Sequence, residues 1–148
     1  MKIRNSKGFT LIELLIVVAI IGIIAAIAIP NLLNAIDRGK QKRTMADMRS
    51  IGTAVESYAI DSNIYPVGGD LATVAPSLQP LYIKVLPTVD GWQGTMDYDS
   101  ADGSEYTVQA YAKGSANDGY TGGATGNFSD DIFFVNGQFV QWPEGAQQ

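Results

Sequence analysis

The hydrophobic pattern of the chain begins with a long apolar run. From Phe9 to Ile29 the sequence reads FTLIELLIVVAIIGIIAAIAI, and Glu13 is its only charged residue. A helix rises by about 1.5 Å per residue, so this run matches the roughly 30 Å hydrocarbon layer of a bilayer. It is also longer than the apolar core of a cleaved secretory signal and lacks a small-residue cleavage site behind it. We therefore expect a transmembrane helical segment over residues 9–30.

Apolar residues return with helical spacing behind Pro30. Proline lacks an amide hydrogen and clashes with the preceding turn, so Pro30 is expected to bend the helix without ending it. The pattern then predicts one continuous helix from residue 9 to about 60, apolar on all sides in its first half and on one side in its second. The residues of this one-sided stripe are Met45, Met48, Ile51, Val55 and Tyr58.

The C-terminal half carries strand signals. Residues 70–90 contain three prolines and are expected to form a connecting segment with a short helix or turn. Strands are predicted at 94–98, 106–113, 132–135 and 138–142, and the last two are joined by Asn136-Gly137, the strongest short hairpin signal. The predicted fold class is α+β, with one long N-terminal helix packed on a small antiparallel sheet of three to four strands.

Composition and charge narrow the range of functions. The 148 residues fit one compact lobe plus its termini, and the chain contains no histidine and no cysteine. These two absences exclude Ser-His-Asp and Cys-His nucleophiles, imidazole or thiolate metal sites, and disulfides. Residues 1–60 have eight basic and four acidic side chains, whereas residues 61–148 have two basic and eleven acidic ones. Enzymes built from carboxylates, lysine or hydroxyls would remain possible, but the sequence shows no catalytic constellation of these groups, so we expect no enzyme. We also expect no nucleic-acid-binding protein, because the acidic lobe would repel phosphate.

Glu13 is the anomaly of the apolar run. A charged side chain in the hydrocarbon layer costs at least about 2.5–3.5 kcal/mol, and no basic side chain lies between Lys7 and Arg38. Cleavage between Gly8 and Phe9 would place a new amino group at the depth of the carboxylate, where it could pair with Glu13 of a neighbouring copy. That pairing would favour assembly. The alternative is that Glu13 is a tolerated polar residue near the end of a simple signal anchor.

The segment Lys7-Gly8-Phe9-Thr10-Leu11-Ile12-Glu13-Leu14 resembles the processing motif of type IV prepilins and of the pseudopilins of type II secretion. The resemblance implies that a leader, residues 1–8, is removed after Gly8 by a prepilin peptidase and that the new terminus at Phe9 is N-methylated. It assigns subunit pairing to Phe9 and Glu13. Gly22 and Pro30 stand where this family bends its helix.

The same resemblance implies a homo-oligomer, a helical filament built with an inner-membrane assembly platform and minor pilins or pseudopilins. Before assembly the subunit would sit in membrane lipid, with the lobe of residues 31–148 in the periplasm; after assembly the filament would be periplasmic or at the cell surface. The favoured function is a structural subunit of a type II secretion pseudopilus that drives protein export across the outer membrane. One alternative is the major subunit of a type IV pilus for adhesion and twitching. Another is a non-polymerising membrane-anchored module that binds calcium or carbohydrate.

Two acidic clusters in the lobe contain carboxylates at spacings that could suit calcium. The run 97–105 nearly matches an EF-hand but fails at the twelfth position, so a solvated turn is expected there. Asp118 is separated from Asp130 and Asp131 by a glycine-rich stretch, and a hard cation could gather these carboxylates with loop carbonyls. This arrangement is similar to the calcium loop of major pseudopilins, although the loop is longer, which leaves open whether Asp130 or Asp131 is the ligand. The alternative is a flexible acidic hairpin that binds nothing.

The basic group at residues 38–43 follows the apolar run closely. Three interpretations fit it: a collar facing lipid headgroups before assembly, a salt-bridge partner between subunits afterwards, or a solvated helix face.

Overall fold

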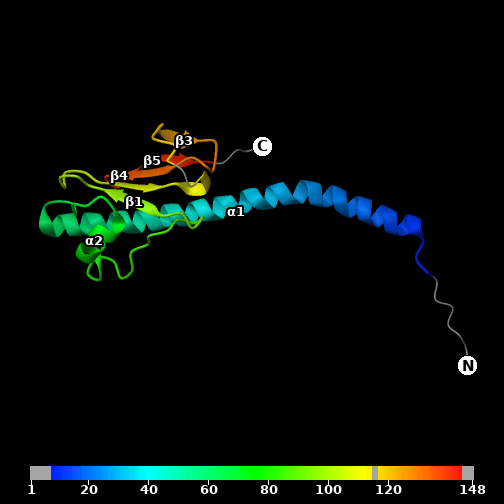
Figure 1. The fold of residues 1–148 in the computed structure, drawn as a ribbon, viewed down its shortest axis with the longest axis horizontal. Coiled ribbons are helices and arrows are strands. Elements are labelled where there is room, and N and C mark those ends of the chain that lie inside the picture. Colours follow the sequence, from blue (N-terminus) through cyan, green and yellow to red (C-terminus); the bar gives the residue numbers. More distant parts are fainter. Residues whose placement is uncertain (1–7, 115–116, 145–148) are drawn as a thin grey trace, which may run out of the picture. The chain divides into compact units, whose positions relative to one another are not determined.

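A computed structural model describes residues 8–114 and 117–144. Its longest element is the helix α1, Leu11–Ser62, which continues through Pro30 without a break (Figure 1). The helix ends close to the predicted position, where Asn63 takes a left-handed conformation with φ of 58° and donates from its amide to the Ala59 carbonyl. The chain divides into two compact units, residues 1–36 and 37–148.

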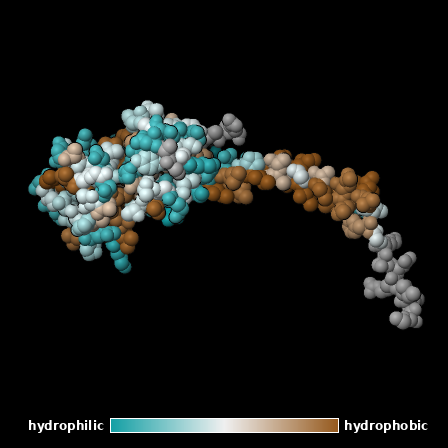
Figure 2. All heavy atoms as spheres, viewed as in Figure 1, coloured by the Kyte–Doolittle hydropathy of each residue, from teal (hydrophilic) through white to brown (hydrophobic). Residues whose placement is uncertain are grey.

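In the first unit α1 exposes its apolar side chains on all sides. Large hydrophobic residues from Phe9 to Ile36 are mostly more than half exposed, and Figure 2 shows them as the brown surface of this segment. Among the described residues, α1 is the one helix long and apolar enough to cross a membrane. Such a surface requires lipid or other protein chains as its environment.

In the second unit α1 buries the predicted stripe. Met48, Ile51 and Val55 are fully buried, while Met45 and Tyr58 pack at the margin of the same core. The strands run alongside this half of α1 in Figure 1, and their inward side chains complete the core. Helix α2, Leu71–Leu78, adds three buried residues to the core. Asp70 is its N-cap, and the Asp70 carboxylate accepts from the Thr73 amide.

The sheet has five strands in the order β1-β2-β4-β5-β3. They are β1 Met96–Asp99, β2 Thr107–Ala110, β3 Gly123–Thr125, β4 Ile132–Val135 and β5 Gln138–Pro143. The first four in this order pair antiparallel. Asn136 and Gly137 both have positive φ, as a two-residue hairpin turn of type I′ requires, so the predicted β4–β5 hairpin is confirmed.

Strand β3 makes the sheet mixed. It pairs parallel to β5, with Ala124 opposite Trp142, whereas the sequence predicted three or four antiparallel strands only. The segment is Gly-Ala-Thr inside a glycine-rich loop and has no alternating pattern by which it could be recognised. The pairing of β3 depends on a tertiary contact, because the side chain of Gln141 on β5 binds the loop that carries β3.

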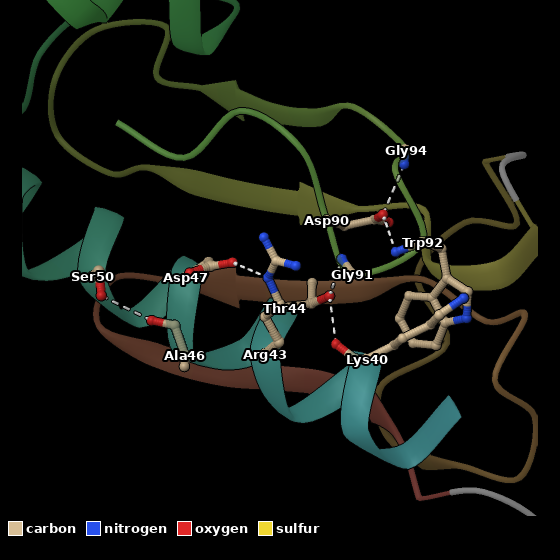
Figure 3. A network of polar contacts seen from close by, with 10 residues as sticks. All are labelled: Lys40, Arg43, Thr44, Ala46, Asp47, Ser50, Asp90, Gly91, Trp92 and Gly94. Atoms are coloured by element: carbon tan, nitrogen blue, oxygen red, sulfur yellow. Dashed lines mark hydrogen bonds and ion pairs between the residues drawn. The ribbon is translucent and has the colours of Figure 1, made fainter. Parts of the chain in front are cut away.

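Hydrogen bonds connect the turn before β1 to α1 (Figure 3). The carboxylate Oδ1 of the fully buried Asp90 accepts from the amides of Trp92 and Gly94, both at 2.8 Å. The Gly91 amide donates to the Thr44 hydroxyl, which itself donates to the Lys40 carbonyl. A side chain at Gly91 would lie 2.4 Å from that carbonyl oxygen, so only glycine allows this close approach.

Candidate functional site: the N-terminal segment and the acidic loop

Glu13 is bound by a residue of its own chain. Thr10 directly precedes α1, and its amide and hydroxyl both donate to Glu13 Oε2, at 2.8 and 2.6 Å. The Glu13 amide in turn approaches the Thr10 hydroxyl at 3.3 Å. These reciprocal bonds form a capping box, which satisfies donors that the first turn of a helix otherwise leaves unpaired.

Thr10 was not predicted as a partner of Glu13, because only a basic side chain would offer the carboxylate a countercharge. The signal was present in the sequence as Thr-x-x-Glu, the capping-box pattern, immediately before an apolar run. In the isolated chain, therefore, polar groups of the helix end solvate the carboxylate without neutralising it. The charge itself remains available to a cation from another molecule.

The other predicted N-terminal positions lie along the same helix or just before it. Phe9 is 83% exposed, and among residues 8–114 and 117–144 no atom beyond its chain neighbours lies within 4 Å of the place where a side chain at Gly8 would start. Both residues are thus accessible around the peptide bond at which cleavage is predicted. A side chain at Gly22 would also meet nothing within 4 Å, so the position is open on the helix surface.

Asp118 and Asp131 come together in the second predicted site. Asp131 immediately precedes β4 and is fully buried. Its Oδ2 accepts from Gln109 Nε2 at 2.8 Å and from the Asp118 amide at 3.2 Å. Its Oδ1 is buried and has no hydrogen-bond partner among the described residues. An orphaned carboxylate oxygen of this kind suits a cation.

Burial raises the pKa of Asp131, and the hydrogen bonds from Gln109 and Asp118 counteract this only in part. The neighbouring negative charges of Asp118 and Asp130 raise the pKa further. Ionised Asp131 is therefore costly unless a positive charge reaches it.

Two further oxygens of the loop lie near Gly114. Gly114 lies beside both the Asp118 carboxylate and the Ser129 carbonyl, and a side chain there would approach the carbonyl oxygen to 2.6 Å. Asp131 is the buried carboxylate, whereas Asp130 is only half-buried, so Asp131 is the better candidate ligand. No group of three or more acidic side chains is gathered closely enough for a metal within residues 8–114 and 117–144, so backbone oxygens or water would have to complete the coordination.

Gln141 on β5 organises the loop and was missed by sequence reasoning. It is 1% exposed, and its Oε1 accepts from the Thr121 and Gly122 amides at 2.7 and 2.9 Å. Its Nε2 donates to the backbone carbonyl of Asp131 at 3.0 Å. A polar residue in an alternating strand offers no sign that it will face inward and bind a loop twenty residues earlier.

The run 97–105 contains no comparable arrangement. Asp99, Asp102 and Glu105 are exposed, and Asp102 accepts from the amide and hydroxyl of Ser104 at 2.9 and 2.6 Å. Asp97 is bound by the Tyr111 hydroxyl. Asp97 and Asp99 lie on β1 itself, so the predicted solvated turn is confined to the residues after this strand, where Asp102 and Glu105 are exposed.

Comparison with known proteins places the chain in a family. Residues 3–29 match the model of the prokaryotic N-terminal methylation motif. The type II secretion system core protein G of Vibrio cholerae is 33% identical over 132 residues, which cover 82% of this chain and 88% of that protein. The protein of the same name from Pseudomonas aeruginosa is 33% identical over 135 residues, 84% of this chain and 92% of its own length.

Relatives that are pilins match a shorter part of this chain. The type IV wide pilus major component PilA4 of Thermus thermophilus is 53% identical over 62 residues, which cover 42% of this chain and 47% of that protein. No solved structure matches the chain at a significant level. The two core protein G relatives cover more than four fifths of this chain, and the chain belongs to the family of type II secretion system core protein G, the major pseudopilins.

Proposed function

We propose that the protein is the major structural subunit of a type II secretion pseudopilus, whose growth drives protein export across the outer membrane. The observation that carries this proposal is the similarity to core protein G along most of both chains, including the acidic lobe. The function is mechanical. The exposed apolar half of α1 would lie in the membrane before assembly and pack against other copies in the filament.

Assembly would exchange the partners of Glu13. Cleavage after Gly8 creates an amino group on Phe9, and N-methylation leaves its positive charge in place. Thr10 supplies the carboxylate with hydrogen bonds but no countercharge. In a low-dielectric environment the amino group of a neighbouring copy offers the countercharge, so the pairing favours the filament over the lone subunit.

The cellular setting follows from this role. The subunit would be held in the inner membrane with its lobe in the periplasm, and would be processed by the prepilin peptidase. An inner-membrane assembly platform and minor pseudopilins would then add it to a periplasmic filament. Its work requires no catalytic step by this chain.

Mass spectrometry of assembled material tests the processing. The expected mature protein starts at Phe9 and carries one additional methyl group. Assembled filaments that retain residues 1–8 would overturn the proposal. Deletion of the gene tests the function, because exported enzymes should then accumulate inside the cell while surface pili persist.

A type IV pilus subunit is the second candidate. It is supported by the high identity to a pilin relative, 53% over 62 residues with PilA4. That match covers 42% of this chain, whereas the match to core protein G of Vibrio cholerae covers 82% of it. Loss of surface filaments and twitching with normal export, in the same deletion strain, would favour the pilus.

We also propose that the loop 117–131 binds one calcium ion through Asp118 and Asp131. The support is the orphaned Oδ1 of a buried carboxylate, the adjacent Asp118 and the Ser129 carbonyl beside Gly114. The bound ion would supply the positive charge that ionised Asp131 lacks and would stabilise the loop. Asp130 is the other candidate ligand.

Calcium titration of the full chain in detergent tests this site. Calcium should raise the melting temperature of the lobe, and a chelator should lower it. Asp131→Asn and Asp118→Asn should abolish the shift, whereas Asp102→Asn, in the exposed turn, should retain it. An equal calcium response in all three variants would exclude the site, and loss of the response in Asp130→Asn alone would assign the ligand to Asp130.

A further inference from the structure

A group of basic side chains lies where α1 leaves its apolar segment. Ile36 is the last of the exposed large hydrophobic residues in this part of the helix, and Asp37, which follows it, is buried. Arg38, Lys40, Lys42 and Arg43 come next within six residues, a rise of about 7.5 Å. We call these four residues the basic collar. Three of them are exposed, and Lys40 is half-buried.

The carboxylates near the basic collar are already engaged. Asp37 accepts from Trp92 Nε1 at 3.0 Å and from Lys113 Nζ at 2.8 Å. The Asp47 carboxylate is 3.7 Å from Nε of Arg43. A dashed line marks this ion pair in Figure 3. Within the part of the chain that the structure describes, neither Arg38 nor Lys42 has a carboxylate within 4.0 Å. These two cations are four residues apart and project from the same side of the helix.

The length of helix before the basic collar matches a bilayer. Leu11 begins α1, and the 27 steps from Leu11 to Arg38 correspond to about 40 Å of helix. A bilayer including its headgroups is about 40–45 Å thick, so a helix that starts at one surface brings Arg38 to the headgroups of the other. The half-buried indole of Trp92 donates a hydrogen bond to Asp37. Tryptophan is enriched at membrane interfaces.

We propose that the basic collar binds the headgroups of anionic phospholipids, with Arg38 and Lys42 as the principal phosphate contacts. The guanidinium of Arg38 can donate two parallel hydrogen bonds to a phosphate, and Lys42 adds a second, point-like charge. The inference rests on the membrane-anchored stage of the proposed function. It adds a lipid preference to that stage, and it implies that entry into a filament breaks these lipid contacts.

Fluorescence quenching by brominated lipids tests the proposal on the full chain in vesicles. The chain has two tryptophans, so Trp142→Phe leaves Trp92 beside the basic collar as the reporter. Vesicles contain phosphatidylcholine with the same mole fraction of either brominated phosphatidylglycerol or brominated phosphatidylcholine. The expected result is stronger quenching of Trp92 by the anionic lipid, and a difference that shrinks at high salt.

Three variants give the test its specificity. Arg38→Gln with Lys42→Gln should lower the preference for the anionic lipid by about fivefold for each cation removed. Arg38→Lys with Lys42→Arg keeps both charges and should retain the preference. Lys84→Gln removes an exposed cation far along the chain, on the loop after α2, and should have no effect. Quenching measured with both tryptophans present serves as a second readout if Trp142→Phe disturbs the lobe.

Equal quenching by the two lipids in the parent protein would overturn the proposal. So would an equal loss in Lys84→Gln, which would indicate a diffuse charge effect, or an unchanged preference in the double glutamine variant. If that variant keeps its lipid preference but loses cross-links between copies, the basic collar is a subunit contact instead. Failure of the chain to enter phosphatidylcholine vesicles at all would instead refute the membrane anchoring assumed in the proposed function.

Discussion

Gln141 Nε2 donates a hydrogen bond of 3.0 Å to the backbone carbonyl oxygen of Asp131. The same side chain accepts from the amides of Thr121 and Gly122 through its Oε1. One buried glutamine on β5 thus holds the glycine-rich loop on one side and the start of β4 on the other. It connects the segment that carries β3 to the residue with the orphaned carboxylate oxygen.

Replacing Gln141 should destabilise the lobe even without calcium. Gln141→Leu leaves two loop amides and the Asp131 carbonyl without their partner, and we expect a loss of roughly 2–4 kcal/mol in the free energy of unfolding. Gln138→Leu, at an exposed position of the same strand, is the matched control and should cost less than about 0.5 kcal/mol. Thermal melts of the full chain in detergent with chelator present measure both, and equal stability of the two variants would contradict the role of Gln141.

Asp37 should make stability depend on pH in the acid range. Burial acts to raise the pKa of Asp37, but hydrogen bonds from Lys113 and Trp92 and the charges of Lys113 and Lys40 outweigh it, so the pKa lies below its usual 3.8. A lowered folded-state pKa contributes stability above the unfolded pKa, and this contribution is lost as the pH falls through the folded value.

Asp37→Asn tests this dependence. Because Lys113 is half exposed, the variant should lose only about 1 kcal/mol of stability at neutral pH, and the difference from the parent should shrink below about pH 4. Asp47→Asn removes a more exposed ion pair and should change stability by less than about 0.5 kcal/mol. Melts of the parent and both variants across the acid range measure these differences, and a constant difference between Asp37→Asn and the parent would count against the ion pair.

Gly52 should not tolerate a side chain, because α1 meets the sheet there. A methyl group at Gly52 would lie 2.3 Å from Phe134 Cε1, and the ring of Phe134 is itself 2% exposed and cannot move aside freely. We expect Gly52→Ala to cost about 1–3 kcal/mol of unfolding free energy. Gly39→Ala, on the same helix with nothing within 4 Å, should stabilise by about 0.5–1 kcal/mol. Opposite signs in chemical denaturation are the expected outcome, and a neutral Gly52→Ala would refute the close contact.

The charge of Glu13 should matter for assembly and not for insertion. Glu13→Leu is expected to insert in the membrane but to yield at least about tenfold fewer filaments, because the Phe9 amine loses its countercharge. Glu13→Gln keeps an oxygen that can accept from the Thr10 amide, so it separates the capping box from the charge. Both variants should assemble poorly by electron microscopy of sheared material, and normal filaments from Glu13→Gln would show that the hydrogen bond and not the charge is required.

The elements with strong local periodicity could be predicted from the sequence. The apolar run and the stripe through Met48, Ile51 and Val55 predicted one helix, and Asn136-Gly137 predicted the hairpin. Both elements are recognisable because their hydrogen bonds join residues close together in the chain. The motif around Gly8, Phe9 and Glu13 could likewise be recognised, since the N-terminal methylation motif is a short linear segment.

The rest was decided by contacts between distant residues. β3 has no pattern of its own and forms because Gln141 holds the loop at Thr121 and Gly122 against β5. Asp131 is buried whereas Asp130 is half-buried, and the buried carboxylate of Asp131 accepts a hydrogen bond from Gln109 on β2. The positions of the local backbone hydrogen bonds and the half of α1 that is apolar all round follow from the order of the residues along the chain. Which polar side chains face inward depends on the folded lobe, because a buried polar group is stable only where a partner from elsewhere in the chain meets it.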